Sequence, residues 1–550
     1  MATSSYLALE GVSCVLPNGN TLFSDLTERF DLRRTALVGR NGCGKTLLAR
    51  MLAGQIAPSQ GQVVRSGKVQ RVHYLAQHTS PTADATVADL AGVRSTLDAL
   101  ARIAAGSTSA ADFDTVGDAW DMAQRLRDAL DAQGLQHADA GTLVSNLSGG
   151  EAMRVALLGA QLSGADFLIL DEPSNHLDQA ARQALADWLQ QWVGGLLVIS
   201  HDRQLLTGME RIVELSPLGL RSYGGNYAFY AQAKAQEQQS AMADLDRAKQ
   251  DRRRAVQAMR DQRERQEKRQ TRAAKGAKQA NQAKILLDRQ KERSDQSIGK
   301  LHRQQADAQA AHSQRVRDAA AQVAEDAHIH LHAPTSTGIA QRVVAVLDQV
   351  QLPWVHTSAG PIDLQITGQQ RVGLLGPNGC GKSTLLKMIA GRLPPVSGVC
   401  KVTPQIAYLD QALDSLDGQT SALQQLQAVN RSLSEGELRM RLAQLGLDAE
   451  QVVAPSGTLS GGEHLKAALA CVLYADTPPQ LLLLDEPSNH LDLPSLQALE
   501  QLLTRYQGAL LVVSHDTAFL QALDLTDLLV ASDDGWELRS ADALYAPQSP

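Results

Sequence analysis

The feature that most constrains this chain is an internal duplication. Four short motifs occur twice, in the same order. They are, first copy and then second, GRNGCGKT (39–46) and GPNGCGKS (376–383), LSGGE (147–151) and LSGGE (459–463), LILDEPSNHLD (168–178) and LLLDEPSNHLD (482–492), and ISHD (199–202) and VSHD (513–516). The interval from Asp171 to His201 is 30 residues, as is that from Asp485 to His515. The 550 residues therefore contain two copies of one domain.

The two copies differ in one interval. Lys45 and Ser148 are 103 residues apart, whereas Lys382 and Ser460 are 78 residues apart, so the first copy has 25 more residues before its LSGGE motif. We expect these extra residues in a helical region around 86–136.

A segment of different composition separates the copies. Residues 231–330 contain no Phe, Trp, Tyr or Pro and are rich in Ala, Gln, Arg and Lys, which favour helices. We therefore divide the chain into a first domain (1–230), a linker (231–338) and a second domain (339–550). Gly276 is the plausible turn between two antiparallel linker helices of about 45 residues each, or about 65–70 Å.

Charge is distributed unevenly along the chain. The net charge is −7, but residues 247–303 contain 19 basic and 7 acidic residues, a net charge of +12, so the rest carries −19. From Arg260 to Lys284 nine residues are basic and three acidic, with no large aliphatic residue. Apolar residues at heptad-like spacing lie nearer the ends of the linker, where two helices can pair. A basic arm of this kind suits the phosphates and shape of structured RNA.

Both GxxxxGK[ST] motifs follow an apolar strand and lead into an apolar helix, the context that a phosphate-binding loop requires. The glycines let successive N–H groups point at phosphates, and the helix N-terminus adds partial positive charge. Lys45 and Lys382 are expected to reach the β- and γ-phosphates, and Thr46 and Ser383 to hold Mg²⁺. The nucleotide-binding residues expected here are Gly39, Asn41, Gly42, Gly44, Lys45, Thr46 and Leu47, and Gly376, Asn378, Gly379, Gly381, Lys382, Ser383 and Thr384.

Two further apolar strands end in acids, and two end in histidine. Asp171 and Asp485 are expected on the Mg²⁺ side of the nucleotide. The following Glu172 and Glu486 would lie beside the γ-phosphate, where a carboxylate can orient and deprotonate water. His201 and His515 could each donate a hydrogen bond to the γ-phosphate. An isolated acidic pair or histidine is often structural, but the repeat places all of them identically.

The combination of a phosphate loop, LSGGE, a strand ending in DE, and SHD resembles the ATP-binding cassette superfamily. This resemblance covers roughly residues 6–228 and 340–545. It implies two α/β cassettes packed head to tail, each ATP held by the phosphate loop of one cassette and the LSGGE motif of the other. Ser148, Gly149 and Gly150 would then face the nucleotide on Lys382. Ser460, Gly461 and Gly462 would face the one on Lys45, and SNHLD would couple the two sites.

The resemblance also implies residues outside these motifs. Gln77 and Gln411 resemble the glutamine loop that contacts Mg²⁺ and water. The family usually stacks an aromatic residue on adenine, and Trp354 could serve in the second cassette. The matching place in the first, near Leu16, has no aromatic residue, although a leucine can still pack on the ring. Neither copy lacks a catalytic residue, so both sites are expected to hydrolyse ATP.

The order cassette, charged helical linker, cassette resembles the ABC-F group. That resemblance implies a cytoplasmic ATPase with ATP and Mg²⁺ as cofactors. It would act on the ribosome at the tRNA exit site, with linker residues 247–303 contacting rRNA and tRNA. The cassettes would pair within one monomer. A housekeeping translation factor and an antibiotic-displacing ribosome protection protein remain alternatives, and the basic tip favours the former.

Two other classes of function, an exporter ATPase subunit and a DNA-maintenance ATPase, are alternatives. No window reaches the 18–20 apolar residues of a membrane helix, and the linker has no purpose in the ATPase subunit of an exporter with separate membrane subunits. A DNA-maintenance ATPase is a further alternative, but the residues after the last SHD motif are acidic rather than basic. Five scattered cysteines form no CxxC pair, which argues against a disulfide framework or a metal cluster.

Overall fold

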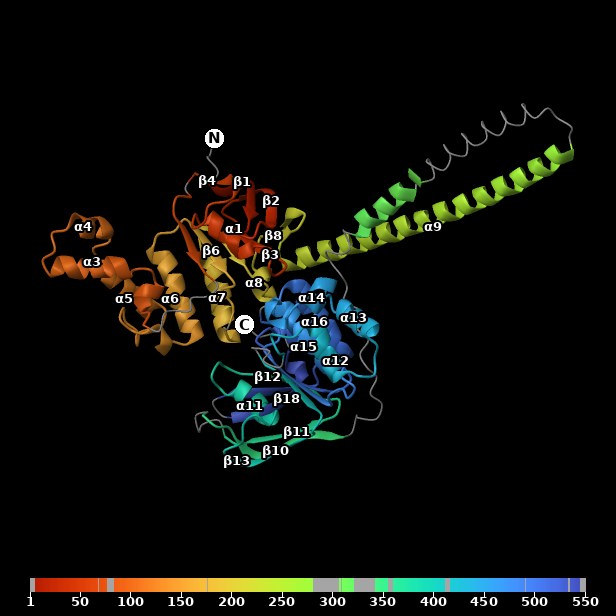
Figure 1. Cartoon of the computed structure of the whole chain (residues 1–550). Coiled ribbons are helices and arrows are strands. Elements are labelled where there is room, and N and C mark those ends of the chain that lie inside the picture. Colours follow the sequence, from red (N-terminus) through yellow and green to blue (C-terminus); the bar gives the residue numbers. More distant parts are fainter. Residues whose placement is uncertain are drawn as a thin grey trace. The chain divides into compact units, whose positions relative to one another are not determined.

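The structure is a computed structural model that describes residues 5–67, 69–76, 84–175, 177–279, 306–307, 309–320, 342–354, 360–410, 416–489, 491–532 and 535–544. The chain separates into two compact units (Figure 1). One comprises Met1–Tyr230 and Ile329–Pro550 and contains both cassettes; the other is Ala231–His328. The boundary expected between residues 338 and 339 lies outside the described residues.

The first cassette contains a three-stranded antiparallel sheet, in the order β2-β1-β4, and a six-stranded sheet, in the order β5-β6-β7-β3-β8-β9. Only β9 is antiparallel to its neighbour in the second of these sheets. The elements are β1 Tyr6–Val15, β2 Thr21–Phe30, β3 Arg34–Gly39, α1 Lys45–Leu52, β4 Gln60–Ser66, β5 Val72–Leu75, α2 Val87–Leu90, α3 Arg94–Ala104, α4 Ala110–Val116, α5 Met122–Ala132, η1 Val144–Asn146, α6 Gly149–Leu162, β6 Phe167–Asp171, α7 Gln179–Gln191, β7 Gly195–Ile199, α8 Arg203–Thr207, β8 Arg211–Ser216 and β9 Gly219–Gly224.

The second cassette repeats this arrangement. Its sheets have the orders β11-β10-β13 and β14-β15-β16-β12-β17-β18. The elements are β10 Val343–Gln351, β11 Ile362–Thr367, β12 Arg371–Leu375, α11 Lys382–Ile389, β13 Ser397–Val402, β14 Ile406–Leu409, α12 Ala422–Val429, α13 Glu435–Gln444, α14 Ala449–Val453, η3 Ser456–Thr458, α15 Gly461–Leu473, β15 Leu481–Asp485, α16 Leu493–Arg505, β16 Ala509–Val513, α17 Thr517–Ala522, β17 Asp527–Ser532, β18 Gly535–Ser540 and η4 Ala541–Leu544. The α/β class with two tandem cassettes is confirmed.

The main core of each cassette explains where the phosphate loop lies. Leu48 and Leu52 of α1 are buried in one apolar cluster with Leu9 of β1 and Leu37 of β3. The helix is thereby held between the antiparallel sheet and one face of the parallel sheet. β6 and β7 are buried at every position, as expected for strands covered on both faces. The parallel strands end at one edge, so residues that follow β3, β6 and β7 are gathered there.

The extra residues of the first cassette are helical, as expected. Among the described residues, four helices (α2 to α5) lie between β5 and α6, whereas three (α12 to α14) lie between β14 and α15. Leu126 and Leu130 of α5 pack with Val155 and Leu158 of α6 in a separate apolar cluster. This helical region therefore has its own small apolar core, packed against α6.

The linker begins with one long helix, α9, from Tyr227 to Gln279. Its 53 residues span about 80 Å. The expected turn at Gly276 is wrong, because α9 continues through it. A single glycine costs a helix only about 1 kcal/mol relative to alanine, too little to end one flanked by strong helix formers. Residues 309–320 are also helical, and the connection between the two helical segments lies outside the described residues.

One face of α9 is apolar near its base. Met242, Leu245, Val256 and Met259 are half-buried, whereas the run from Asp251 to Arg254 is exposed. These four apolar positions of α9 therefore lie on the less exposed side of the helix. None of the described helices combines the length and apolar character that a bilayer crossing requires.

Gly61 offers a test of the packing beneath α1. It lies in β4 with φ +80°, and a Cβ there would meet the carbonyl oxygen of Gly11 and that of Glu10. We expect Gly61→Ala to lower the free energy of unfolding by about 3 kcal/mol or more, because backbone atoms cannot move aside. Denaturant titration would measure this.

Gly92 is the matched control, since it has φ +67° and nothing within 4 Å of a built Cβ. Gly92→Ala should cost only about 1 kcal/mol, the penalty of left-handed backbone alone. Equal losses for the two variants would show that the contact with Gly11 does not determine the fold.

Candidate functional site

Each phosphate loop connects a buried strand to a helix whose first residue is the loop lysine. Gly44 and Gly381 cap α1 and α11 with φ +99°, a conformation that glycine adopts without strain. Lys45 Nζ donates to the carbonyl oxygens of Gly39 (2.7 Å) and Arg40 (2.9 Å). Lys382 Nζ donates in the same way to Gly376 and Pro377, both at 2.8 Å. Both lysines are thus buried and held within their own loops.

The aspartates at the ends of β6 and β15 are fixed by tyrosines. Tyr74 Oη donates to Asp171 Oδ2 at 3.1 Å, and Tyr408 Oη donates to Asp485 Oδ2 at 3.2 Å. In the second cassette Ser383 Oγ donates to Asp485 Oδ1 at 3.1 Å. The structure therefore brings the loop hydroxyl and the strand aspartate together. Sequence reasoning missed both tyrosines, whose signal was that each lies three residues before the glutamine of its motif, Tyr74 before Gln77 and Tyr408 before Gln411.

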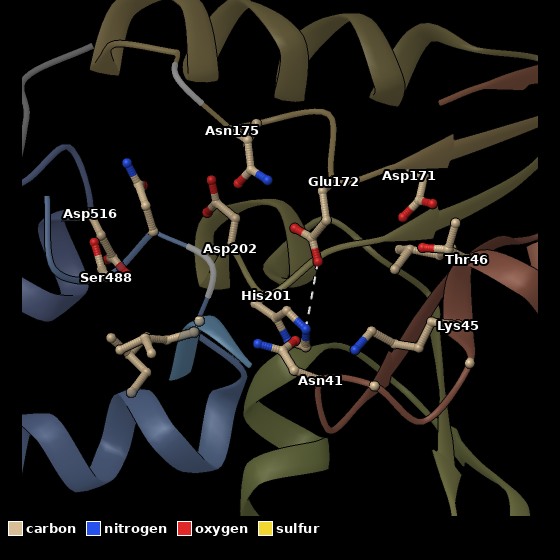
Figure 2. Close-up of a pocket in the computed structure, with 18 of the residues that line it drawn as sticks. Asn41, Lys45, Thr46, Asp171, Glu172, Asn175, His201, Asp202, Ser488 and Asp516 are labelled. Atoms are coloured by element: carbon tan, nitrogen blue, oxygen red, sulfur yellow. Dashed lines mark ion pairs between the residues drawn. The ribbon is translucent and has the colours of Figure 1, made fainter. Parts of the chain in front are cut away.

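Glu172 and Glu486 have the same unusual backbone. Their φ values are 49° and 50°, in the left-handed region that residues other than glycine rarely adopt. Glu172 Oε1 lies 3.5 Å from His201 Nε2, and Glu486 Oε1 lies 3.5 Å from His515 Nε2 (Figure 2 shows the first pair). Such strain costs about 1–3 kcal/mol and persists only where the surroundings enforce it. Both glutamates are thus aimed into their pockets by the turn that follows the strand.

Burial controls the ionisation of these side chains. It raises the pKa of Glu172 to about 8 and that of Glu486 to about 7. Burial, aided by the charge of Lys45, holds the pKa of His201 well below its ordinary value, and burial lowers the pKa of His515 to about 4. Both imidazoles are therefore neutral near pH 7. A carboxylate with a raised pKa is a stronger base once it is ionised.

Some buried polar atoms in these pockets accept or donate no hydrogen bond among the described residues. They are both ring nitrogens of His201 and Oε1 of Glu486. His515 Nε2, in contrast, lies 3.1 Å from Asn378 Oδ1. Buried polar groups are normally paired, so these atoms fit a phosphate oxygen or a water in the pocket. The polar atoms of these pockets are therefore suited to the phosphates of a nucleoside triphosphate.

The phosphate loops are also bound by the opposite cassette. Asp492 Oδ1 accepts the Ser495 N–H at 2.9 Å and so caps α16, while its Oδ2 accepts the Asn41 N–H at 2.9 Å. Asp178 repeats this: Oδ1 accepts from Ala181, and Oδ2 accepts the Asn378 N–H at 3.4 Å. These aspartates end the two SNHLD motifs. One carboxylate therefore joins a helix start in one cassette to the phosphate loop of the other.

The LSGGE motifs form matching helix starts but are placed differently. Ser148 and Ser460 cap α6 and α15, each within a capping box completed by the glutamate of the motif. Gly461 lines the pocket that contains Lys45 and Glu172, as expected for a site shared between cassettes. Ser148, Gly149 and Gly150 are not among the residues that line the pocket of Lys382. A residue of the opposite LSGGE motif therefore lines the first ATP pocket but not the second.

The pockets differ at the position expected for adenine. Trp354 lines the second pocket and is 84% exposed, so its ring face is available. Leu22 is among the apolar residues that line the first pocket, whereas Leu16, near which the adenine-side residue is expected, is not. β2 begins at Thr21, so Leu22 lies on the strand, whereas Leu16 precedes the turn. Gln77 and Gln411 lie outside the described residues.

A buried ion pair crosses the cassette interface near both sites. Arg203 Nη1 lies 2.7 Å from Glu500 Oε1, and Nη2 lies 3.2 Å from Oε2, a bidentate geometry. Arg203 directly follows the first SHD motif, and Glu500 lies in α16. The corresponding residues of the other copies are Thr517 and Ala186, so no motif signalled this pair.

A sequence profile of the family described as "ABC transporter" matches residues 31–175 and 359–489. The energy-dependent translational throttle protein EttA of Mycobacterium tuberculosis is 30% identical over 533 residues, covering 92% of this chain and 88% of that protein. ABC transporter F family member 5 of Arabidopsis thaliana is 28% identical, covering 94% and 73%. The crystal structure of archaeal ribosome recycling factor aABCE1 with stalk protein aP1 matches with a TM-score of 0.56 at 18% identity, covering 97% of this chain and 91% of that one.

Two phosphate loops, each facing a strained glutamate and closed by an aspartate of the other copy, define a protein with paired nucleotide sites between P-loop domains. The chain belongs to the ATP-binding cassette family, in its F branch of tandem-cassette proteins. It is an ATPase. The recognition made from the repeated motifs is thereby confirmed.

The ion pair between Arg203 and Glu500 allows a direct test of cassette pairing. Arg203→Met should lower stability by about 3 kcal/mol, because it leaves the largely covered Glu500 without a counterion. Combining Arg203→Met with Glu500→Leu should recover most of this loss, because neither charge is then buried. A urea titration of the four proteins in the double-mutant cycle measures the coupling. Additive effects would mean that the two side chains do not interact in solution.

Proposed function

We propose that this ATPase is a translation factor that binds the ribosome near the tRNA exit site and contacts rRNA and tRNA through its basic linker. ATP and Mg²⁺ would be its cofactors, one chain would supply both cassettes, and the cytoplasm would be its location. The observation that carries the proposal is the joining of two shared ATP sites to a long helical arm of net positive charge.

The residues of each site have distinct proposed roles. Lys45 and Lys382 would leave their loop carbonyls to bind the β- and γ-phosphates, and backbone N–H groups of the loops would bind the remaining oxygens. The orphaned nitrogens of His201 lie where they can bind a γ-phosphate oxygen. Ser460 with Gly461 and Gly462, and Ser148 with Gly149 and Gly150, would close on these phosphates from the opposite cassette.

The donor set suits Mg²⁺. No cluster of three or more His, Cys, Asp or Glu side chains that could hold a metal occurs in the described part of the chain. Mg²⁺ typically takes one or two protein oxygens and completes its shell with phosphates and water. Thr46 with Asp171, and Ser383 with Asp485, would supply those oxygens, with Gln77 and Gln411 as further contacts. The bound ion would neutralise charge on the phosphates.

Glu172 and Glu486 are the proposed general bases. Replacing both with glutamine should reduce ATP turnover at least about 100-fold while ATP stays bound, because the amide orients water but takes no proton. Phosphate release and retention of radiolabelled ATP would be measured together.

The matched control, Glu435→Gln with Glu537→Gln, removes two exposed acids and so changes the net charge by the same amount. Neither residue lines an ATP pocket. Its turnover should equal that of the parent protein. If the Glu172→Gln, Glu486→Gln protein also turned over ATP at the parental rate, neither glutamate would be the base.

The arm is built for a polyanion rather than for an apolar partner. Arg252, Arg253 and Arg254 are all exposed on α9, while the apolar residues of the same helix are half-buried. A helix of about 80 Å presents such charge along a long, regular surface. The absence of aromatic residues in the linker sequence leaves phosphate contact and shape as the means of recognition. The name of the mycobacterial relative, a translational throttle, points to the ribosome as the source of those phosphates.

Neutralising part of the arm tests this role. Arg252→Gln, Arg253→Gln and Arg254→Gln together should weaken binding of the Glu172→Gln, Glu486→Gln protein to ribosomes. They should also reduce the slope of log affinity against log salt by about 2–3, one unit or slightly less for each lost phosphate contact. Co-sedimentation with 70S ribosomes at several salt concentrations measures both.

The control carries the same charge change on the cassettes: Arg33→Gln, Arg439→Gln and Arg539→Gln, all exposed. It should bind with nearly the parental salt dependence. Equal effects of the two triple variants would contradict a specific role for the arm. Recovery of the chain with membranes or with duplex DNA, but not with ribosomes, would favour the exporter or DNA-maintenance alternative.

A further inference from the structure

Arg182 has no place among the family motifs, yet it lies at the second ATP pocket. It belongs to α7 of the first cassette, four residues after the Asp178 that binds the second phosphate loop. The pocket that contains Lys382, Glu486 and His515 is lined by Arg182. Among the described lining residues of that pocket, Arg182 is the single one from the first cassette.

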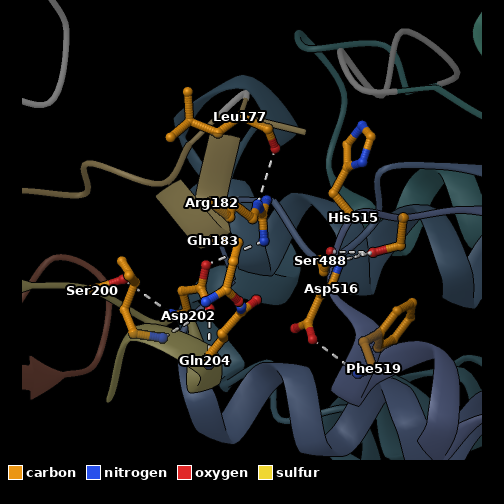
Figure 3. Close-up of polar contacts among 12 residues, drawn as sticks. Leu177, Arg182, Gln183, Ser200, Asp202, Gln204, Ser488, His515, Asp516 and Phe519 are labelled. Carbon is orange, nitrogen blue, oxygen red and sulfur yellow. Dashed lines mark hydrogen bonds and ion pairs between the residues drawn. The ribbon is translucent and has the colours of Figure 1, made fainter. Parts of the chain in front are cut away.

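The guanidinium is held firmly from its own cassette. Nε donates to the carbonyl oxygen of Leu177 at 3.0 Å, and Nη1 donates to Asp202 Oδ2 at 3.3 Å (Figure 3). The residue is only 6% exposed. Burying an arginine is costly, and an apolar residue of similar volume often stabilises such a position better. A buried cation at the wall of a pocket is therefore better explained by what it does there than by stability.

Its charge reaches the reacting groups of the opposite cassette. Arg182 interacts electrostatically with Glu486, His515 and Asp516. Arg182 also contacts Asp202, which follows His201 and lines the first pocket. One side chain thus lines both ATP pockets and contacts Asp202 of the first.

Arg182 also lines the first pocket, but from the same cassette as Lys45 and Glu172. Among the described residues that line this pocket, no arginine comes from the second cassette. The residue four positions after Asp492 is Leu496, which lines the first pocket at the equivalent place. Every residue with a proposed catalytic role occurs in both copies, so this exchange of arginine for leucine is a chemical difference between otherwise matching sites.

We propose that Arg182 is a positioning residue of the second ATP site, supplied across the interface by the first cassette, which orients Glu486 for hydrolysis; the second cassette presents Leu496 instead of an arginine to the first site. A fixed cation beside the candidate base is in place only when the cassettes are paired. Hydrolysis on Lys382 thereby depends on the position of Asp178 and Asp202 across the interface. The inference rests on the proposed roles of Glu172 and Glu486 as bases.

The test measures each site separately in the full chain. Glu172→Gln leaves the second site to turn over ATP, and Glu486→Gln leaves the first. Adding Arg182→Gln should lower kcat at the second site roughly tenfold, with little change in KM; this is less than the about 100- to 1000-fold loss for a donor that contacts the reacting atoms, because Arg182 acts through Glu486. The loss at the first site should be several-fold smaller. Arg182→Lys should restore part of the second-site rate, because it keeps the charge.

Arg203→Gln is the matched control, because it removes another buried interface arginine that lines neither pocket. A loss through weaker cassette pairing should affect both sites equally, as this control is expected to do. Equal losses at the two sites with Arg182→Gln, or a rise in KM without loss of kcat, would overturn the proposal. Thermal unfolding of each variant identifies proteins that fail to fold, and Arg182→Lys then provides the same comparison between sites.

The Glu172→Gln, Glu486→Gln protein separates the two levels of inference. If it remains active, the bases are wrongly assigned and the proposed function loses its chemical basis. If it is inactive and Arg182→Gln affects both sites alike, only the role of Arg182 fails.

Discussion

The site geometry depends on two carboxylates that each serve both cassettes. Asp492 caps its own helix with one oxygen and binds the phosphate-loop amide of Asn41 with the other, and Asp178 does the same for Asn378. Hydrogen bonds from Ser495 and Asn41 outweigh the effect of burial and lower the pKa of Asp492. Because each carboxylate is anchored at a helix N-terminus, a shift of that helix must move the loop that binds phosphate in the other cassette. Cassette pairing thereby fixes the position of each phosphate loop.

Several residues near this contact have strained backbone or hold a charge away from solvent. Glu172 and Glu486 have left-handed backbone, and both are buried with raised pKa values. Arg203 and Glu500 bury opposite charges across the same interface. Each is costly alone, and each is retained because the paired cassettes enclose it. The same enclosure makes electrostatic interactions with a phosphate stronger than they would be in water. The first site is closed by Gly461 and the second is faced by Arg182, so the two sites are alike in their motifs and unlike in their surroundings.

Much of this could be read from the sequence, because the motifs mark the ends of strands. Lys45, Asp171, Glu172 and His201 follow three neighbouring parallel strands, so their convergence follows from the fold. Contacts between cassettes could not be predicted in this way: Arg203 and Glu500 are 297 residues apart and share no periodicity or repeat. Tyr74 was missed because it belongs to none of the recognised motifs, although its hydroxyl contacts Asp171. Leu22 was missed because it lies on β2, after the turn that follows Leu16. Gly276 was misjudged because helix formers on both sides outweigh one glycine.

Shared binding of each ATP by both cassettes of one chain can be tested by a structure of the Glu172→Gln, Glu486→Gln protein determined with ATP and Mg²⁺. We expect two nucleotides, one contacting Lys45 together with Ser460 and Gly461, the other contacting Lys382 together with Ser148 and Gly149. Nucleotides bound to the phosphate loops while the LSGGE motifs of the opposite cassette remain apart from them would contradict it.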